Sequence, residues 1–309
     1  MQIETLSLPA TDGTPLAATL YEPADTAANG RIVILNSAVG VRRGFYDRFA
    51  RALADRGFAV LTYDYRGIGD SRPTGPRGAQ GTIQEWGGKD FAGVLDWTAD
   101  AQPVRTIAVI GHSIGGQVVG LAPNNGRIAA MLTVSSQIGW CGHWDRPARY
   151  MLRFVWHVFL PGTVRMLGYF PARRLGFGDN LPPGIALEWA RWCRNPRYMV
   201  DERGEPLRTY FDRFRGSLLA YSFADDPFAP RRSVDALVAQ YRNAAAEHRH
   251  MVPRALRLPK IAHSGFFRGP GREALWPEAA EWLLAATRPS PAGAAALSPS
   301  TADLSRSHS

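Results

Sequence analysis

The chain has 309 residues, of which 45% are hydrophobic, and this is enough to bury a large core in one α/β domain with an insertion or in two domains. The formal net charge is +9, but the basic residues are almost all arginines scattered among acidic and aromatic residues. Because no nucleic-acid-binding motif accompanies them, we expect no nucleic-acid partner. No apolar stretch of about 18 residues occurs, so the sequence predicts no transmembrane segment.

Two features predict a reducing, cytoplasmic location. The two cysteines, Cys141 and Cys193, are too few for a disulfide framework and are expected to be free thiols, although a single bridge between them stays an alternative. The first residues contain no basic start followed by an apolar run, so no signal peptide is expected there.

The first 136 residues alternate between buried strands and amphipathic helices. A hairpin is expected within residues 1–30, and strands are expected at 31–35, 58–63, 107–110 and 128–134. Helical spacing occupies residues 45–56 and 86–97. This alternation predicts a mostly parallel, twisted sheet flanked by helices on both faces.

Residues 137–215 interrupt that alternation. They carry five tryptophans and many arginines, with helical patterns at 148–160 and 184–194 and no convincing strand. Residues 151–170 are apolar and aromatic but include arginines, which suits an amphipathic helix over a pocket or at a membrane surface. Because the segment lies inside a sheet fold, we favour the pocket and interpret 137–215 as a helical cap.

The sheet is expected to resume after the insertion. A strand is predicted at residues 218–223, a helix at 233–248, a short strand at 254–258 and a closing helix at 274–286. Residues 289–309 are rich in Ser, Ala and Pro with little to bury, so a disordered tail is expected. The predicted domains are therefore a core of 1–136 and 216–288, the cap of 137–215 and the tail.

The stretch Gly-His-Ser-Ile-Gly at 111–115 is the strongest chemical signal in the sequence. It follows a predicted buried strand and precedes a short predicted helix. So tight a turn forces Ser113 into a strained backbone conformation, and glycines on either side let the strand and the helix approach closely. Ser113 is thereby exposed at the positive end of a helix and is the candidate nucleophile.

A serine hydroxyl needs a base, and the base needs an acid to orient it. Among the seven histidines, His263 is the best candidate base because it lies in a loop after the last predicted strand. The acid should follow a strand between Ser113 and His263, and both Asp225 and Asp226 do so. We favour Asp226, which begins a sharp exit turn before proline, and Asp225 stays the alternative.

The order of Ser113, an aspartate at 225 or 226, and His263 is the serine–acid–histidine order of the α/β-hydrolases. Together with the motifs at 64–71 (Asp-Tyr-Arg-Gly-Ile-Gly-Asp-Ser), 111–116 and 225–227, it makes residues of about 10–288 resemble a capped α/β-hydrolase. The resemblance is to serine hydrolases of the serine aminopeptidase or monoglyceride-lipase-like type. It implies the α/β-hydrolase fold with a helical cap.

An oxyanion hole needs two backbone N–H groups. Ile114, directly after the candidate nucleophile, is expected to supply one. The resembled families carry His-Gly after the strand at 31–35 and use the N–H of the next residue. Here that loop begins Asn36-Ser37-Ala38, so the resemblance implies Ala38, although the missing His-Gly is a departure from the pattern.

The predicted function is hydrolysis of a carboxylic ester or thioester through an acyl-enzyme. The aromatic cap predicts a small-molecule substrate with an apolar group. An amidase or peptidase with the same triad is the alternative enzyme, and a non-catalytic hydrolase fold that binds a ligand is the alternative outside catalysis. No metal site or cofactor is expected, because no ligand set has metal spacing and no nucleotide-binding motif occurs. The sequence leaves the oligomeric state open.

Overall fold

Eight strands form one sheet in the computed structural model, which describes residues 1–269 and 271–288. The sheet has the order β1-β2-β4-β3-β5-β6-β7-β8. The pairs β1–β2 and β2–β4 are antiparallel and the other pairs are parallel, so the expected mostly parallel sheet is confirmed. The strands are β1 (Gln2–Pro9), β2 (Pro15–Glu22), β3 (Arg31–Asn36), β4 (Ala59–Tyr63), β5 (Thr106–His112), β6 (Ala130–Val134), β7 (Ser217–Phe223) and β8 (Ala245–Met251).

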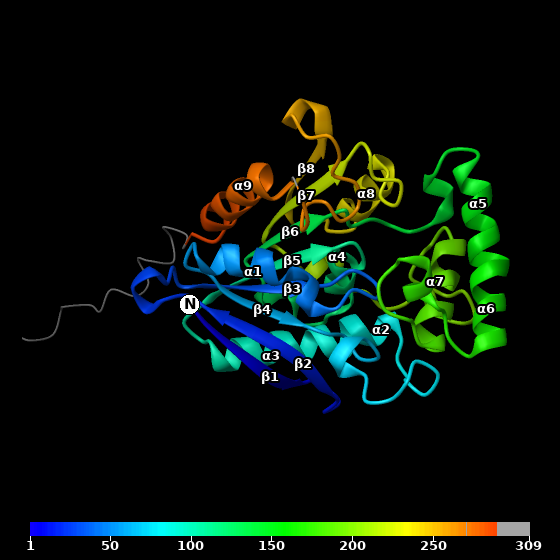
Figure 1. Cartoon of the computed structure of the whole chain (residues 1–309), viewed down its shortest axis with the longest axis horizontal. Helices are drawn as coiled ribbons and strands as arrows, with labels where there is room; N and C mark the ends of the chain where they lie inside the picture. The colour runs from blue at the N-terminus through cyan, green and yellow to red at the C-terminus, as the bar shows by residue number, and fades with distance from the viewer. Residues whose placement is uncertain (270, 289–309) are drawn as a thin grey trace, which may run out of the picture.

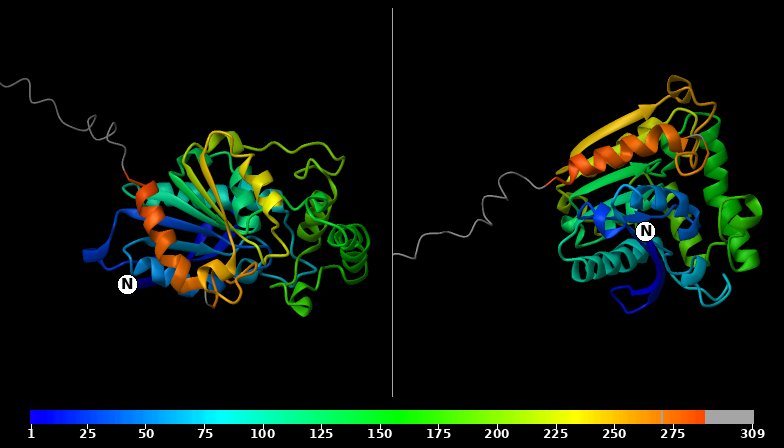
Figure 2. Two further views of the ribbon diagram at one scale, coloured as in Figure 1. Left: turned by 90° about the horizontal axis from the view of Figure 1, so that it is seen from above. Right: turned by 60° about the vertical axis from the view of Figure 1, so that its left-hand side comes forward.

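Helices cover both faces of this sheet, which explains why the central strands are almost continuously apolar. One core cluster joins the sheet to α1 and α9, and the other joins it to α2, α3, α4 and α8 (Figures 1 and 2). The helices of these two layers are α1 (Asp47–Ala54), α2 (Ile83–Glu85), α3 (Ala92–Ala101), α4 (Ile114–Val118), α8 (Arg231–Val238) and α9 (Gly271–Ala286).

The chain between β6 and β7 forms helices rather than strands of the sheet, as expected. Its helices are α5 (Ala148–Phe154), α6 (Leu160–Leu167) and α7 (Pro183–Arg194). A π-helical stretch, Val155–Phe159, joins α5 to α6, so the first helix runs beyond the expected residue 160 and ends at Gly168 with a φ of +76°. Figure 1 shows α5, α6 and α7 together at one side of the molecule, beyond the end of the sheet.

The helix predicted over 233–248 is wrong in its second half. The helix α8 ends at Val238, and β8 begins at Ala245 and pairs with all seven residues of β7. Alanine and glutamate in this stretch favour a helix locally, but the open edge of β7 offers a full parallel ladder. Propensity is a weak prior that such tertiary pairing overrides. His248 and His250 consequently lie on one face of β8, each 2.7 Å from Ser222 Oγ.

The short strand predicted at 254–258 is also wrong. A 3-10 helix, Pro253–Leu256, occupies this position, and Arg257 ends it with a φ of +57°. Proline suits the first helical position because its missing N–H would have no partner there. The predicted tail at 289–309 lies outside the described residues.

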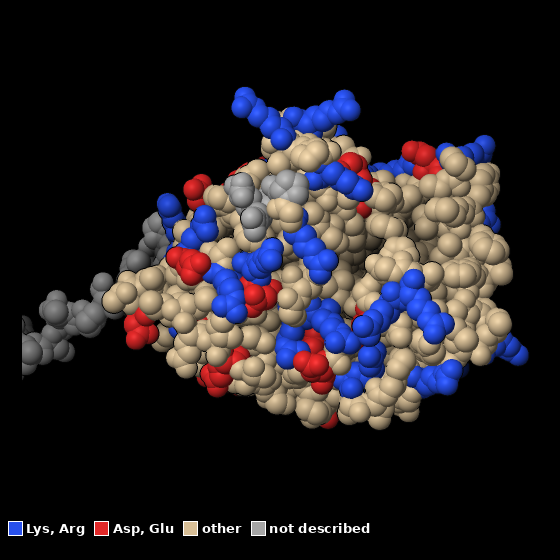
Figure 3. Space-filling view, in the orientation of Figure 1, with Lys and Arg blue, Asp and Glu red and all other residues tan. Residues whose placement is uncertain are grey.

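Charged side chains are spread over the surface. In the view of Figure 3, basic side chains are scattered over the face and fewer acidic ones lie among them. Within the described residues, no helix is both long and apolar enough to cross a lipid bilayer.

The closest approach of two elements near Ser113 gives the first prediction. A Cβ atom at Gly115 would lie 2.2 Å from the Asn36 carbonyl oxygen, so Gly115→Ala must push α4 away from β3. We expect a loss of about 1–3 kcal/mol in the free energy of unfolding, measured by chemical denaturation. The control is Gly162→Ala in α6, where a Cβ would meet nothing within 4 Å. Equal stability of both variants would contradict this packing.

Candidate active site

The chain reverses sharply between β5 and α4, and Ser113 occupies the turn. Its backbone has φ +54° and ψ −117°, a conformation that costs about 1–3 kcal/mol for a residue other than glycine. A Cβ at Gly111 would lie 2.5 Å from the Gly116 nitrogen, so the turn requires glycine there. Ser113 N–H donates to the Val134 carbonyl at 3.0 Å, which ties the turn to β6. This is the strained strand–turn–helix geometry expected from the sequence.

His263 and Asp226 lie together at the loops that follow β7 and β8. His263 Nδ1 is 2.9 Å from Asp226 Oδ2 and 3.2 Å from Oδ1. The Asp226 side chain is fully buried, and Phe228 N–H also donates to it. Burial favours the neutral carboxyl, but the hydrogen bond and charge of His263 outweigh burial and hold the pKa of Asp226 below its usual value. The carboxylate therefore fixes the imidazole with its proton on Nδ1 and leaves Nε2 as an acceptor.

Asp225, the alternative acid, has a different set of partners. Its carboxylate accepts the N–H groups of Ile261 at 2.9 Å and Ala262 at 3.0 Å. Ala262 has a φ of +50°, so this contact holds a strained backbone directly before His263. Between the two adjacent carboxylates, Asp226 contacts the imidazole and Asp225 holds the loop that carries it.

The sequence did not reveal the role of His112, the neighbour of Ser113. It is fully buried, its Nδ1 is 2.9 Å from Tyr46 Oη, and its Nε2 is 2.8 Å from the carbonyl oxygen of His263. Burial, together with the nearby His263, lowers the pKa of His112 to about 3, so its ring is neutral at ordinary pH. Because a carbonyl only accepts, the His112 proton lies on Nε2. The only sign of this role in the sequence is the position of His112 directly before Ser113.

The two expected oxyanion donors, the N–H groups of Ile114 and Ala38, differ in whether they are already hydrogen-bonded. Ile114 is the first residue of α4, and the first N–H of a helix has no intrahelical acceptor. The Ala38 N–H, in contrast, donates to the buried Tyr46 Oη at 2.9 Å. One N–H carries one hydrogen, so the Ala38 amide is already occupied. The sequence could not show this, because Tyr46 reaches the loop only through tertiary packing.

Ser113 and His263 lie on neighbouring loops but are not hydrogen-bonded to each other. Among the hydrogen bonds of residues 1–269 and 271–288, none joins Ser113 Oγ to His263 Nε2. The His112 and His263 rings lie with their centroids 5.3 Å apart, so the turn that carries Ser113 lies next to the loop that carries His263. Hydrogen bonds between a catalytic serine and its histidine are often long in ligand-free proteins and tighten when the substrate binds.

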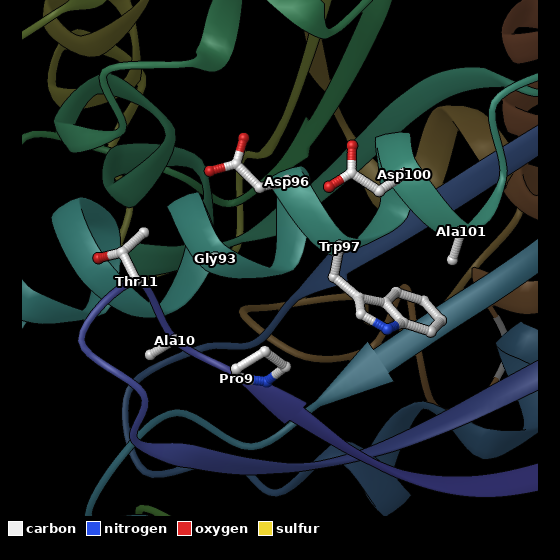
Figure 4. A pocket seen from close by; sticks show the side chains of 8 residues that line it. All are labelled: Pro9, Ala10, Thr11, Gly93, Asp96, Trp97, Asp100 and Ala101. Carbon is white, nitrogen blue, oxygen red and sulfur yellow. The ribbon is translucent and has the colours of Figure 1, made fainter.

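A cavity, but no cluster of metal ligands, occurs elsewhere in the described chain. No group of three or more His, Cys, Asp or Glu side chains there could hold a metal ion. A cavity of about 490 Å³ lies between the end of β1 and α3, beside Asp96, Trp97 and Asp100 (Figure 4). None of the candidate site residues lines it.

Comparison with known proteins identifies the fold. A family model described as serine aminopeptidase, S33 matches residues 27–163. A soluble variant of monoglyceride lipase from Saccharomyces cerevisiae, solved with a substrate analogue, has a TM-score of 0.67 at 13% identity and covers 94% of this chain and 97% of its own. An esterase of Pyrococcus furiosus has a TM-score of 0.59 at 17% identity, with 93% and 92% covered. The chain therefore has the fold of the α/β serine hydrolases.

Relatives by sequence match this chain over shorter segments. The quorum-quenching protein AidA of Acinetobacter baumannii is 31% identical over 121 residues, which are 38% of this chain and 38% of that protein. Protein ABHD12B of Homo sapiens is 32% identical over 109 residues, 35% of this chain and 27% of that protein. The matched segments thus span only about a third of the relatives' length.

The neutral, buried His112 gives a prediction on stability. Its folded pKa of about 3 lies below the value of about 6.5 for an unfolded histidine. Between these pH values the unfolded chain binds more protons, so acidification lowers the free energy of unfolding, by up to about 1.4 kcal/mol per pH unit. His112→Gln keeps a donor for the His263 carbonyl but cannot titrate.

Urea unfolding from pH 7 to pH 4.5 measures this difference. We expect the stability of the wild-type chain to fall more steeply with acidification than that of His112→Gln. Replacement of the exposed His157 by Gln is the control and should follow the wild type. Parallel curves for all three proteins would contradict a neutral His112.

Proposed function

We propose that this α/β-hydrolase is a serine hydrolase that cleaves a carboxylic ester or thioester through an acyl-enzyme. The observation that carries the proposal is the bond of 2.9 Å between His263 Nδ1 and the buried Asp226 carboxylate, beside the strained turn of Ser113. A strained serine, a buried carboxylate and an imidazole in this chain order serve nucleophilic catalysis. A buried carboxylate is costly unless it is paired, so its contact with His263 distinguishes this histidine from one on the surface.

The reaction follows from the proton positions. Ser113 Oγ attacks the carbonyl carbon while its proton moves to His263 Nε2, and the carbonyl oxygen becomes an oxyanion beside the Ile114 N–H. His263 then gives that proton to the leaving alkoxide or thiolate as the bond to the acyl carbon breaks. Water repeats the sequence: its proton moves to His263, its oxygen bonds to the acyl carbon, and the acid leaves as Ser113 regains the proton. Asp226 stays ionised and stabilises the imidazolium throughout.

We further propose that the segment between β6 and β7 acts as a cap. Two contacts support this role. Trp144 Nε1 donates to the Pro227 carbonyl at 2.7 Å, next to Asp226, and Asp179 N–H donates to the Gly40 carbonyl at 2.6 Å, in the loop after β3. The segment thus touches the loops on both sides of Ser113. Closing such a site excludes water from the acyl-enzyme.

An apolar group on the substrate is favoured by two aromatic side chains next to the base. The Phe228 ring lies 5.4 Å from the His263 ring, and Phe177 of the cap segment lies 5.8 Å from Phe228. Both rings are about half exposed, at 43% and 52%. Removing exposed apolar surface from water is favourable, so an acyl or alkyl chain of a small ester is the substrate group that suits these two rings.

Labelling with a fluorophosphonate probe tests the nucleophile. We expect the wild-type chain to be labelled and Ser113→Ala to be unlabelled, because the probe phosphonylates only an activated serine. Ser222→Ala is the matched control, since Ser222 also contacts two histidines but is fully buried in β7. p-Nitrophenyl esters of two to twelve carbons would then give the preferred acyl length. A folded wild-type chain that is neither labelled nor active would favour the non-catalytic binding protein, and faster cleavage of anilides would favour an amidase.

The adjacent aspartates provide a second test. In Asp226→Asn the imidazole loses its anionic partner and its tautomer, and we expect kcat to fall by about 10³–10⁴-fold. In Asp225→Asn one backbone N–H of the loop loses its acceptor, which lowers the free energy of unfolding by about 1–2 kcal/mol with a much smaller loss of kcat. Steady-state kinetics and thermal unfolding separate the two effects. Similar losses of kcat in both variants would contradict the assignment.

A further inference from the structure

The loop after β3 contains a β-turn whose backbone groups are fixed on two sides. The Ala38 carbonyl accepts the Val41 N–H at 3.0 Å, which makes Val39 and Gly40 the central residues of the turn. Gly40 has a φ of +68°, whereas Val39 is not among the described residues with positive φ. This combination is typical of a type II turn, which favours proline at the position of Val39.

The orientation of the Val39 N–H follows from these contacts. In a trans peptide the C=O and N–H point in opposite directions, and the C=O of the Ala38–Val39 peptide points to Val41. The Val39 N–H therefore points out of the turn. It has no acceptor in the part of the chain that the structure describes, whereas the preceding N–H, of Ala38, is bound to Tyr46 Oη.

This loop begins beside the first turn of α4. The Asn36 carbonyl packs against Gly115, and Asn36 Nδ2 donates to the Gly115 carbonyl at 3.2 Å. The free N–H groups of Ile114 and Val39 thus come from two segments in direct contact next to Ser113. Two such donors are what a developing oxyanion requires.

We propose that the Val39 N–H, and not that of Ala38, is the second oxyanion donor, and that Tyr46 and His112 are the residues that position it. This inference rests on the proposed function. The Ala38 N–H donates to Tyr46 Oη, and this bond fixes the peptide that directly precedes the Ala38–Val39 peptide.

A single buried chain of hydrogen bonds carries this positioning. A peptide N–H only donates and a carbonyl only accepts, so every hydrogen in the chain is assigned. The Ala38 N–H lies on Tyr46 Oη, the Tyr46 hydroxyl hydrogen lies on His112 Nδ1, and the His112 Nε2–H lies on the His263 carbonyl. The loop of the amide donor and the loop of the base are therefore fixed by one network, and Phe267 packs on both rings of it at 4.8 and 4.9 Å.

Val39→Pro tests the donor directly, because proline removes the N–H at a turn position that accepts proline. We expect kcat for p-nitrophenyl butyrate to fall by about 10²–10³-fold with a smaller change in KM. The matched control is Asp25→Pro, which places proline at the first central position of the turn closed by the Ala27 N–H and the Ala24 carbonyl, between β2 and β3. Wild-type kcat in a folded Val39→Pro would overturn the proposal.

Tyr46→Phe tests the positioning and does not depend on the folding of a proline variant. It frees the Ala38 N–H but removes the contact that fixes the loop, so kcat should fall about tenfold or more with little change in KM. Tyr221→Phe is the control, because this equally buried tyrosine donates to Glu278 away from the site. His112→Gln should lower kcat similarly, and the double variant with Tyr46→Phe should lose no more than either single variant.

The outcomes separate this inference from the function on which it rests. Unchanged or raised kcat in Tyr46→Phe would show that the Ala38 N–H is the donor and would overturn the inference while the serine hydrolase stands. A wild-type chain that the fluorophosphonate probe does not label would overturn both. A lower kcat in Val39→Pro and Tyr46→Phe, with both controls at the wild-type value, supports the inference.

Discussion

The contact between the turn at Ser113 and the end of β3 is the constraint on which the rest of the site depends. Gly115 packs so closely on Asn36 that no side chain fits between them. This contact, with the bond from Ser113 N–H to Val134, holds a backbone conformation that an isolated chain would leave. It also brings the loop after β3 next to the first turn of α4. The strain at Ser113 and the position of the loop after β3 thus have one origin.

Electrostatics imposes the second requirement. The Asp226 carboxylate is fully buried and stays ionised only because His263 and the Phe228 N–H compensate for lost hydration. A loop that moved away from Asp226 would leave a buried charge without a partner. The contacts of Asp225 with the backbone before His263 restrict that movement, so one carboxylate contacts the imidazole and its neighbour holds the loop that carries it.

The parallel sheet explains why residues far apart in the sequence meet. The carboxyl ends of parallel strands lie at one edge, and the loops after β3, β5, β7 and β8 all leave from it. The segment between β6 and β7 lies beyond the same end of the sheet (Figure 1) and contacts the loops at Gly40 and Pro227. The loops that carry the candidate site residues and the segment between β6 and β7 therefore lie at one end of the sheet.

The sequence by itself determined the alternation of strands and helices, the sharp turn at Ser113 and the order of serine, acid and histidine. These features depend on short-range patterns, namely apolar periodicity and glycine spacing. Only the tertiary structure placed Asp226 rather than Asp225 against His263, bound the Ala38 N–H to Tyr46, and formed β8 from residues with helical propensity. Those choices depend on which atoms lie within about 3 Å of each other, a distance set by packing between segments far apart in the chain.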